Sequence, residues 1–104
     1  MRMLRYEILL PFKYNDGTPV EYKKIYQTKR ELVDKFRAIT VEPQTILGIW
    51  VYEEKEYDDE LIRIIIDVED TKETEEFFRN YKGVLKERFR QIDIWITAFP
   101  IRII

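Results

Sequence analysis

The fold is decided by residues 44–68, where the apolar runs Gln44-Thr-Ile-Leu-Gly-Ile-Trp-Val-Tyr52 and Leu61-Ile-Arg-Ile-Ile-Ile-Asp-Val68 flank a short acidic segment. Both runs are rich in β-branched and aromatic residues and have the length of ordinary strands. The acidic segment, residues 53–60, has the composition of a solvated loop. The stretch is therefore predicted to form a β-hairpin. Its second strand is almost continuously aliphatic and is predicted to lie inside the sheet.

Toward the N-terminus, a strand and a helix precede this hairpin. Residues 4–12 are apolar at the even positions, with Arg5 and Glu7 between them, and this period of two indicates a strand with one buried face. The turn residues Asn15-Asp16-Gly17 follow, and Thr18-Pro-Val-Glu21 then supplies an N-cap hydroxyl and a proline for the first helical turn. Apolar residues at helical spacing predict a helix over residues 20–37.

Toward the C-terminus, a second helix and a last strand complete the chain. Asp70-Thr-Lys-Glu73 has the pattern of a capping box, and apolar residues at helical spacing predict a helix over residues 71–90. Residues 92–99 alternate again and then meet Pro100, which a central strand rarely tolerates. This last strand is therefore predicted to lie at an edge of the sheet.

The order of these elements, β-α-β-β-α-β, is that of the α+β ferredoxin-like sandwich. It predicts a four-stranded antiparallel sheet in the order 4-1-3-2, counted along the chain, with both helices on one face. No linker, internal repeat or low-complexity segment divides residues 1–104. The chain is therefore expected to be a single domain.

Composition narrows the chemistry that this chain can perform. It has no Cys and no His, so it lacks a disulfide framework, a thiol nucleophile and the commonest general base near neutral pH. A net charge of -2 favours no nucleic-acid partner. No apolar run is long enough for a membrane span, and the charged N-terminus lacks the form of a signal peptide. A soluble, cytoplasmic protein with no cofactor and no membrane partner is expected.

Apolar side chains are left outside the predicted core. Strand alternation places some of them on the open face of the sheet, and others lie on strand 44–52, which is an edge strand although it is apolar in both phases. Exposed apolar edges and faces usually mark interfaces. The candidate interface consists of Trp50, Tyr52, Ile65, Trp95 and Phe99. The alternative is that the C-terminal residues 101–104 fold back and cover part of this surface.

Carboxylates are concentrated in one part of the chain. Twelve of the twenty Asp and Glu residues lie between residues 53 and 76, and Asp58, Asp59 and Glu60 are consecutive. Clustered carboxylates can hold Mg²⁺ or Ca²⁺ and support metal-assisted hydrolysis. However, the spacing matches no calcium-binding loop, and consecutive strand residues point to opposite faces. A solvated, charged hairpin loop is the simpler interpretation, and a metal site remains the alternative.

Over nearly its whole length the chain resembles a group of small, uncharacterised bacterial proteins with the same element order. The shared motifs are Tyr6-Glu-Ile-Leu-Leu-Pro11, Asn15-Asp-Gly-Thr-Pro19, Gly48-Ile-Trp50, Tyr57-Asp-Asp-Glu60 and Leu85-Lys-Glu-Arg-Phe89. The resemblance implies the ferredoxin-like fold and no particular activity. It draws attention to Trp50, Tyr57, Asp59 and Glu60 without giving any of them a role.

No motif in the chain forces a catalytic chemistry. The sequence favours a non-catalytic, homo-oligomeric module, most simply a dimer, that binds a protein or a small ligand. The alternative, from a different functional class, is a metal-dependent hydrolase or nuclease that uses Asp58, Asp59 and Glu60.

Overall fold

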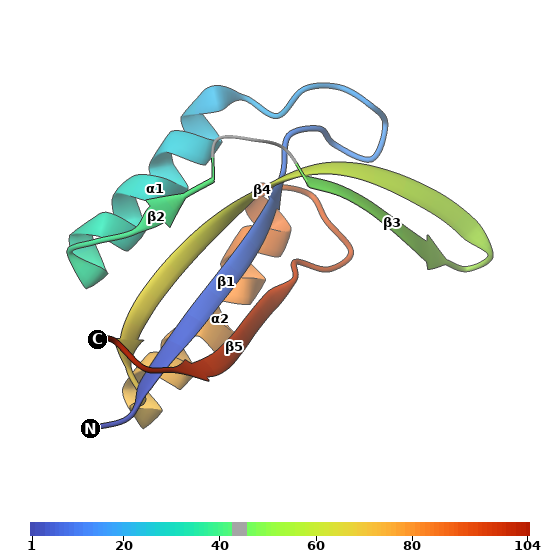
Figure 1. The fold of residues 1–104 in the computed structure, drawn as a ribbon. Helices are drawn as coiled ribbons and strands as arrows, with labels where there is room; N and C mark the ends of the chain where they lie inside the picture. The colour runs from blue at the N-terminus through green and yellow to red at the C-terminus, as the bar shows by residue number, and fades with distance from the viewer. Residues whose placement is uncertain (43–45) are drawn as a thin grey trace.

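The computed structural model describes residues 1–42 and 46–104, which form five strands and two helices (Figure 1). In chain order they are β1 Met3–Pro11, α1 Tyr22–Phe36, β2 Thr40–Val41, β3 Ile46–Tyr52, β4 Lys55–Glu69, α2 Lys72–Arg88 and β5 Ile96–Ile101. Gln44 and Thr45, the predicted start of the first hairpin strand, lie outside the described residues. Neither described helix is long and apolar enough to cross a membrane.

The described strands form one antiparallel sheet, in which β5, β1 and β4 are neighbours and both β2 and β3 pair with β4. This arrangement confirms the α+β ferredoxin-like fold and the predicted order, with the last strand at one edge and the first hairpin strand at the other. The predicted number of four strands was too low. Because β4 is 15 residues long, it has room for β3 along its first half and for the two-residue β2 further on.

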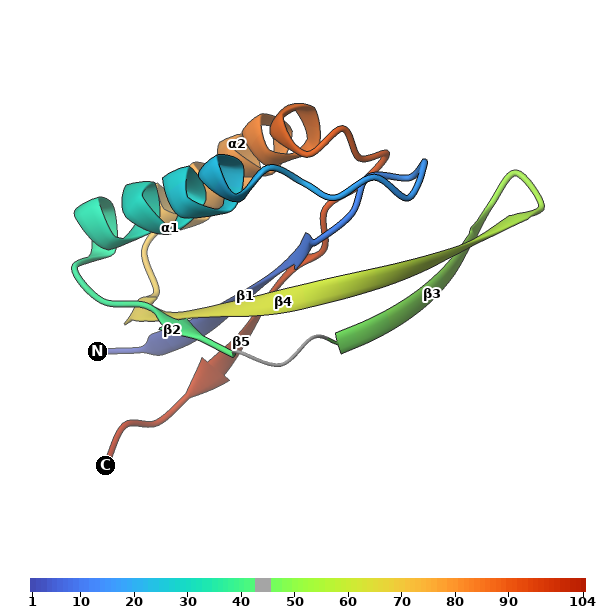
Figure 2. The same ribbon diagram turned by 90° about the horizontal axis from the view of Figure 1, so that it is seen from above.

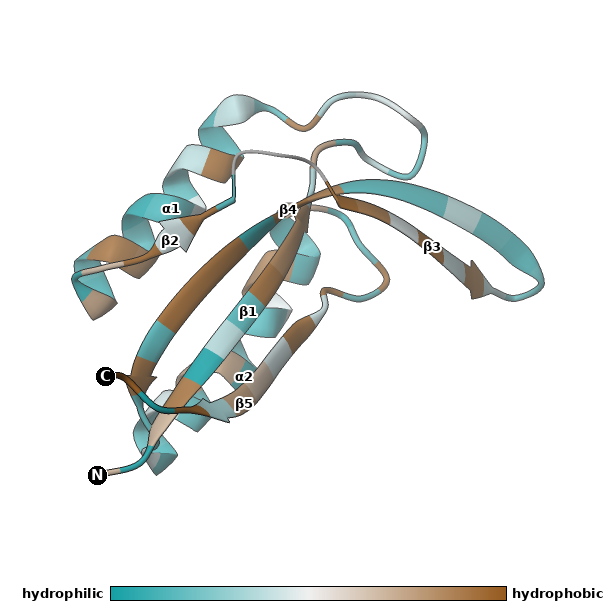
Figure 3. Cartoon of the chain, in the orientation of Figure 1, coloured by the Kyte–Doolittle hydropathy of each residue, from teal (hydrophilic) through white to brown (hydrophobic). Residues whose placement is uncertain are grey.

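Both helices cover the same face of the sheet (Figure 2). The hydrophobic core lies between these two layers and includes the alternate residues of β1 and β4 that face the helices: Tyr6, Ile8, Leu10, Ile62, Ile64 and Ile66. The hydropathy colouring shows β4 changing from hydrophilic to hydrophobic along its length (Figure 3). The aliphatic half of β4 therefore belongs to the core, and its acidic half does not.

The hairpin turn is shorter than the sequence predicted. Tyr52 pairs with Lys55, so the turn consists of Glu53 and Glu54 alone, and both have positive φ angles, 50° and 64°. Two-residue hairpin turns require such angles to match the twist of the strands. The prediction of an acidic loop over residues 53–60 was therefore wrong, because residues 55–60 pair with β3. We call residues 46–60, which project beyond the ends of the two helices in Figure 2, the arm.

The helix starts also differ from the predictions. The hydroxyl and N–H of Thr18 both donate to the Asp16 carboxylate, so the Thr18 hydroxyl does not cap a helix. Instead α1 begins at Tyr22 after Glu21, which makes no side-chain cap. In α2 the cap is Thr71 rather than Asp70, because the Thr71 hydroxyl accepts the Thr74 N–H at 3.1 Å. The predicted helices are confirmed, but each begins at a different residue from the one predicted.

The last strand begins four residues later than predicted. It starts at Ile96 rather than Ile92, and Ile92 is exposed although the predicted alternation placed it in the core. The cause is that residues 91–95 form a connection outside the strands, with a bend at Ile92, in which Ile94 is the one hydrophobic residue that reaches the core. Pro100 lies opposite Leu4 on the edge strand β5, as a strand proline should.

A partly buried polar network joins the two helices. The Arg88 side chain is 11% exposed, and its guanidinium donates to both carboxylate oxygens of Glu31 at 2.9 Å and to the Thr28 hydroxyl at 2.8 Å. The Tyr81 hydroxyl donates to the same carboxylate at 2.7 Å. The bonds from Arg88 lower the pKa of Glu31, while burial and then the bond to Glu31 raise the pKa of Tyr81 well above its usual range.

This network makes stability depend on pH. Because the pKa of Glu31 is lower in the folded than in the unfolded chain, its carboxylate stabilises the fold above the unfolded pKa. The stabilisation is lost as pH falls through the folded pKa. We expect the stability difference between the wild type and Glu31→Gln, from urea unfolding, to be largest at neutral pH and to shrink below about pH 4. Glu87→Gln, on the exposed surface of α2, is the control, and an equal shrinkage there would contradict this assignment.

Candidate functional site

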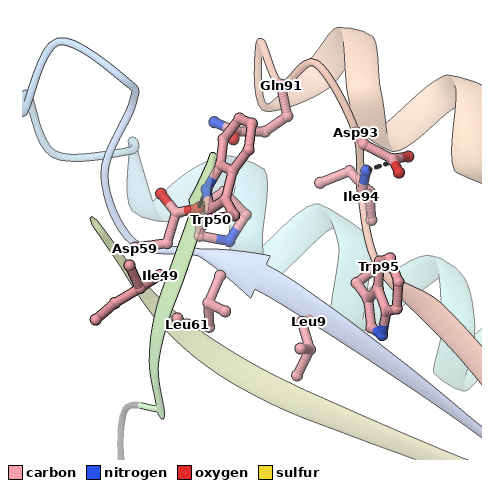
Figure 4. A pocket seen from close by; sticks show the side chains of 11 residues that line it. Leu9, Ile49, Trp50, Asp59, Leu61, Gln91, Asp93, Ile94 and Trp95 are labelled. Carbon is pink, nitrogen blue, oxygen red and sulfur yellow. Dashed lines mark hydrogen bonds between the residues drawn. The ribbon is translucent and has the colours of Figure 1, made fainter. Parts of the chain in front are cut away.

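A cavity of about 350 Å³ opens beside the root of the arm. It lies where β1 ends at Pro11, where the arm separates from β1, and where the connection from α2 to β5 passes. Figure 4 shows Trp50 of the arm and Trp95 of the connection on opposite sides of this space, with Leu9 of β1 between them. The cavity falls in the volume range of about 300–1,000 Å³ that is typical of small-molecule sites.

The arm side of the cavity is built by cross-strand pairs of β3 and β4. The Trp50 indole stacks on its partner Tyr57, with ring centroids 4.5 Å apart and an angle of 16° between the planes. Its Nε1–H donates to the carboxylate of Asp59. Gly48 lies opposite Asp59, and a Cβ at this position would come within 3.0 Å of the Leu61 side chain. Because Gly48 has no side chain, the space beside it is free for the Leu61 side chain and for the cavity.

The other side of the cavity comes from residues 91–95. Gln91 is buried, and its side-chain amide donates to the Phe89 carbonyl at 3.0 Å. Asp93 accepts the N–H of Ile94 and forms an ion pair with Lys82 at 3.0 Å. Trp95 is 63% exposed, and its carbonyl accepts the Leu9 N–H at 3.0 Å. These contacts hold the connection against the end of β1.

The structure divides the five predicted interface residues among three places. Trp50 and Trp95 both line the cavity, although they are far apart in the sequence. Ile65 and Phe99 lie on the open face of the sheet, where they pair with Glu7 and Arg5 of β1. Tyr52 is exposed near the tip of the arm. The C-terminal tail does not cover them, because Ile103 and Ile104 are themselves exposed.

Charged side chains share the open face with these apolar residues. Arg5 pairs with Asp67 at 2.8 Å, and Arg63 pairs with Glu7 at 3.4 Å and with Glu42 at 3.0 Å. Opposite charges at neighbouring cross-strand positions stabilise a solvated sheet surface. The open face is therefore a mixed surface rather than a continuous apolar patch.

The three consecutive carboxylates do not converge. Asp58, Asp59 and Glu60 pair with Ile49, Gly48 and Leu47 of β3, so Asp59 points to one face of the arm and the other two to the opposite face. Among the described residues, no group of three or more His, Cys, Asp or Glu side chains could hold a metal ion. The geometry therefore gives the alternative metal site no ligand cluster within the described chain.

The sequence did not single out the most exposed apolar row in the structure. Leu47, Ile49 and Val51 are 68%, 62% and 68% exposed on one face of β3. Beside them lie Glu60, Asp58 and Glu56 of β4. The sequence did carry a signal for this row, because strand 44–52 is apolar in both phases, but the predicted interface took only Trp50 and Tyr52 from this strand.

No protein-family model matches the sequence, and no curated protein matches it significantly. Solved structures do match its fold. CutA1 from Oryza sativa has a TM-score of 0.65 at 12% identity, with 98% of this chain and 82% of that chain covered. The divalent ion tolerance protein CutA1 from Ehrlichia chaffeensis has a TM-score of 0.61 at 10% identity, with 98% and 83% covered.

The divalent cation tolerance protein from Thermus thermophilus has a TM-score of 0.64 at 14% identity, with 97% of this chain and 85% of that chain covered. Such low identities establish the fold and no shared chemistry. The names of these proteins refer to divalent cations, but this chain has no His or Cys, and its described carboxylates form no ligand cluster. The chain therefore has a CutA1-like ferredoxin fold, and no three of its described His, Cys, Asp or Glu side chains gather as metal ligands.

Proposed function

We propose that the protein is a non-catalytic interaction module that assembles with copies of itself through the outer edge of β3. The observation that carries this proposal is the exposed row of Leu47, Ile49 and Val51 on a strand that, within the described chain, pairs on one side only. An apolar strand with an unpaired edge is a template for pairing with a second strand. A closed two-fold dimer is the simplest assembly that buries such an edge.

The apolar row contributes to the free energy of association. Fully burying an aliphatic side chain of this size contributes about 1.5–3 kcal/mol, so three residues in each of two copies set an upper limit of about 9–18 kcal/mol, of which edge-to-edge pairing gains the part that the facing strand covers. The loss of translational and rotational freedom costs about 4–15 kcal/mol. The two ranges overlap, so the row supports an assembly whose strength depends on the backbone pairing that accompanies it.

The acidic row of the arm favours edge-to-edge pairing over face-to-face packing. Glu56, Asp58 and Glu60 lie on β4, one strand behind the edge. If two β3 strands pair, three strand spacings, about 14 Å, separate the acidic rows of the two copies. This exceeds the Debye length of about 8 Å at physiological salt, so their repulsion is largely screened. Face-to-face packing of two arms would instead bring the rows together.

We expect the double substitution Leu47→Lys and Val51→Lys to convert the assembly into monomers. Each new Lys lies directly opposite a glutamate, Glu60 or Glu56, so the arm keeps favourable cross-strand pairs while its edge becomes charged. Sedimentation equilibrium at tens of micromolar would give the mass of the wild type and of the variant. A wild type that is already monomeric would contradict the proposal.

The control variant is Val84→Lys, which changes an exposed valine on α2 and should leave the mass unchanged. A second variant, Trp95→Asp, tests assembly through the opposite face of the sheet. If Trp95→Asp dissociates the assembly and the two lysines do not, the interface lies on the open face and the edge-pairing proposal fails.

Calorimetry provides a test of the metal-dependent alternative. We expect titration with Mg²⁺, Mn²⁺ or Ca²⁺ to show no micromolar site, because strand alternation turns Asp59 away from Asp58 and Glu60. A micromolar site that disappears when these three residues are replaced by Asn and Gln would favour the hydrolase or nuclease instead.

A further inference from the structure

Beyond self-assembly, we infer that the cavity between Trp50 and Trp95 is a binding site for a small organic cation with an apolar or aromatic body. The site is contained in one chain, because the arm, the end of β1 and the connection to β5 all contribute to its walls. Ile49 of the exposed row is also one of its lining residues, but the site does not require β3 edges to pair.

The charges around the cavity select a cation. Two carboxylates, Asp59 and Asp93, line it, and none of its described lining residues is Lys or Arg. Asp93 already has a cation beside it, the ammonium group of Lys82 at 3.0 Å. Asp59 forms no ion pair with a described cation, and its contact is the neutral N–H of the Trp50 indole. Asp59 is therefore the one lining carboxylate, among the described residues, whose charge is left for a ligand.

The aromatic residues strengthen this preference. Tyr57 covers one face of the Trp50 indole, and Trp50 lines the cavity beside Asp59. An indole attracts cations through its ring quadrupole, and a nearby carboxylate adds a direct charge interaction. A ligand whose ammonium group lies between Asp59 and the face of Trp50 that Tyr57 does not cover would use both interactions.

The remaining walls fit an apolar body. Leu9 and Leu61 form the part of the cavity next to the sheet, and Trp95 closes the side away from the arm. Because Trp95 is 63% exposed, a ligand lying over Leu9 would cover apolar area that is now in water. An inorganic cation would not use these walls, so the geometry favours an organic one.

The protein carries its own reporter for this site, because its two tryptophans are Trp50 and Trp95. Tryptophan fluorescence, checked by calorimetry, would be followed during titration with benzylammonium, benzyl alcohol and benzoate. These probes share an aromatic body and differ in charge. We expect benzylammonium to bind about tenfold more tightly than benzyl alcohol, which corresponds to about 1.4 kcal/mol, and benzoate to bind most weakly.

Substitutions on opposite faces of β4 distinguish the effect of the Asp59 charge at the cavity from the effect of the overall negative charge of the arm. Asp59→Asn keeps an oxygen that can accept the Trp50 N–H, and it should abolish the preference for benzylammonium. Asp58→Asn removes a charge one residue away, on the opposite face, and should preserve the preference. Equal binding of the cationic and neutral probes, or equal effects of the two substitutions, would overturn the inference.

A titration of the Leu47→Lys and Val51→Lys variant separates ligand binding from assembly. If this variant is monomeric and still prefers benzylammonium, the cavity acts within one chain, as inferred. If it binds no probe while the wild type does, the site requires a second copy and the single-chain inference is wrong.

Discussion

Replacing Phe89 with Ala is expected to lower the free energy of unfolding by about 3–5 kcal/mol, the usual cost of removing a fully buried aromatic side chain. Phe89 has no exposed surface and is among the largest fully buried side chains of the described chain. It follows α2 directly and packs in the core at the start of the connection that carries Gln91 and Trp95. Urea unfolding monitored by circular dichroism would measure the change.

Val84→Ala is the control, because Val84 lies on α2, five residues before Phe89, but is exposed. It should change stability by no more than about 0.5 kcal/mol. Phe89→Ala should also alter the fluorescence of Trp95, since the connection loses its anchor. A loss of stability in Phe89→Ala no larger than that in the control would show that the packing at the end of α2 is not as described.

Replacing Arg88 with Met is expected to lower the free energy of unfolding by about 2–3 kcal/mol. Breaking a buried ion pair costs about 3–5 kcal/mol when the remaining charge loses its partner. The Glu31 side chain is 38% exposed, so water can partly replace the guanidinium and the cost is smaller. The Thr28 hydroxyl, which is buried, loses a donor as well.

The control for this prediction is Arg79→Met, on the same helix. Arg79 pairs with Glu75 at 3.4 Å, and its side chain is 74% exposed, so the change should be within about 1 kcal/mol. If Arg88→Met and Arg79→Met destabilise the protein equally, the network between α1 and α2 does not have the role assigned to it. If Arg88→Met is the more destabilising at neutral pH, the measurement is repeated at acid pH. Protonation of Glu31 should there reduce the loss of stability caused by Arg88→Met.

The fold was predictable because its main signals are local and repeated. The period of two in β1 and the aliphatic run of β4 identified the two central strands and the faces that meet the helices. The position of Pro100 identified the edge strand. Few topologies are compatible with this order of strands and helices together with these central and edge assignments. The ferredoxin-like sheet is one that satisfies all of them.

The predictions that failed concern side-chain or backbone groups that could form hydrogen bonds with either of two partners. Thr18 was expected to cap a helix, but its hydroxyl donates to Asp16, two residues away. Residues 55–60 were expected to form a loop because they are charged, yet they pair with β3 once Glu53 and Glu54 adopt positive φ angles. The composition of a segment indicates whether its side chains favour solvent. Whether the segment forms a strand also depends on whether another strand lies beside it in the fold.

By itself, the sequence determined the helices, the principal strands, their buried faces and the exclusion of histidine and cysteine chemistry, because these follow from composition and from periods of two and 3.6 residues. Only the tertiary structure decided that Trp50 and Trp95 share a cavity, that Asp59 faces it, and that Asp58 and Glu60 face away. The physical reason is that a site depends on register and on contacts between distant segments. A shift of one residue in β3 or β4 would turn every side chain of that strand to the opposite face, and no local pattern specifies that register on its own.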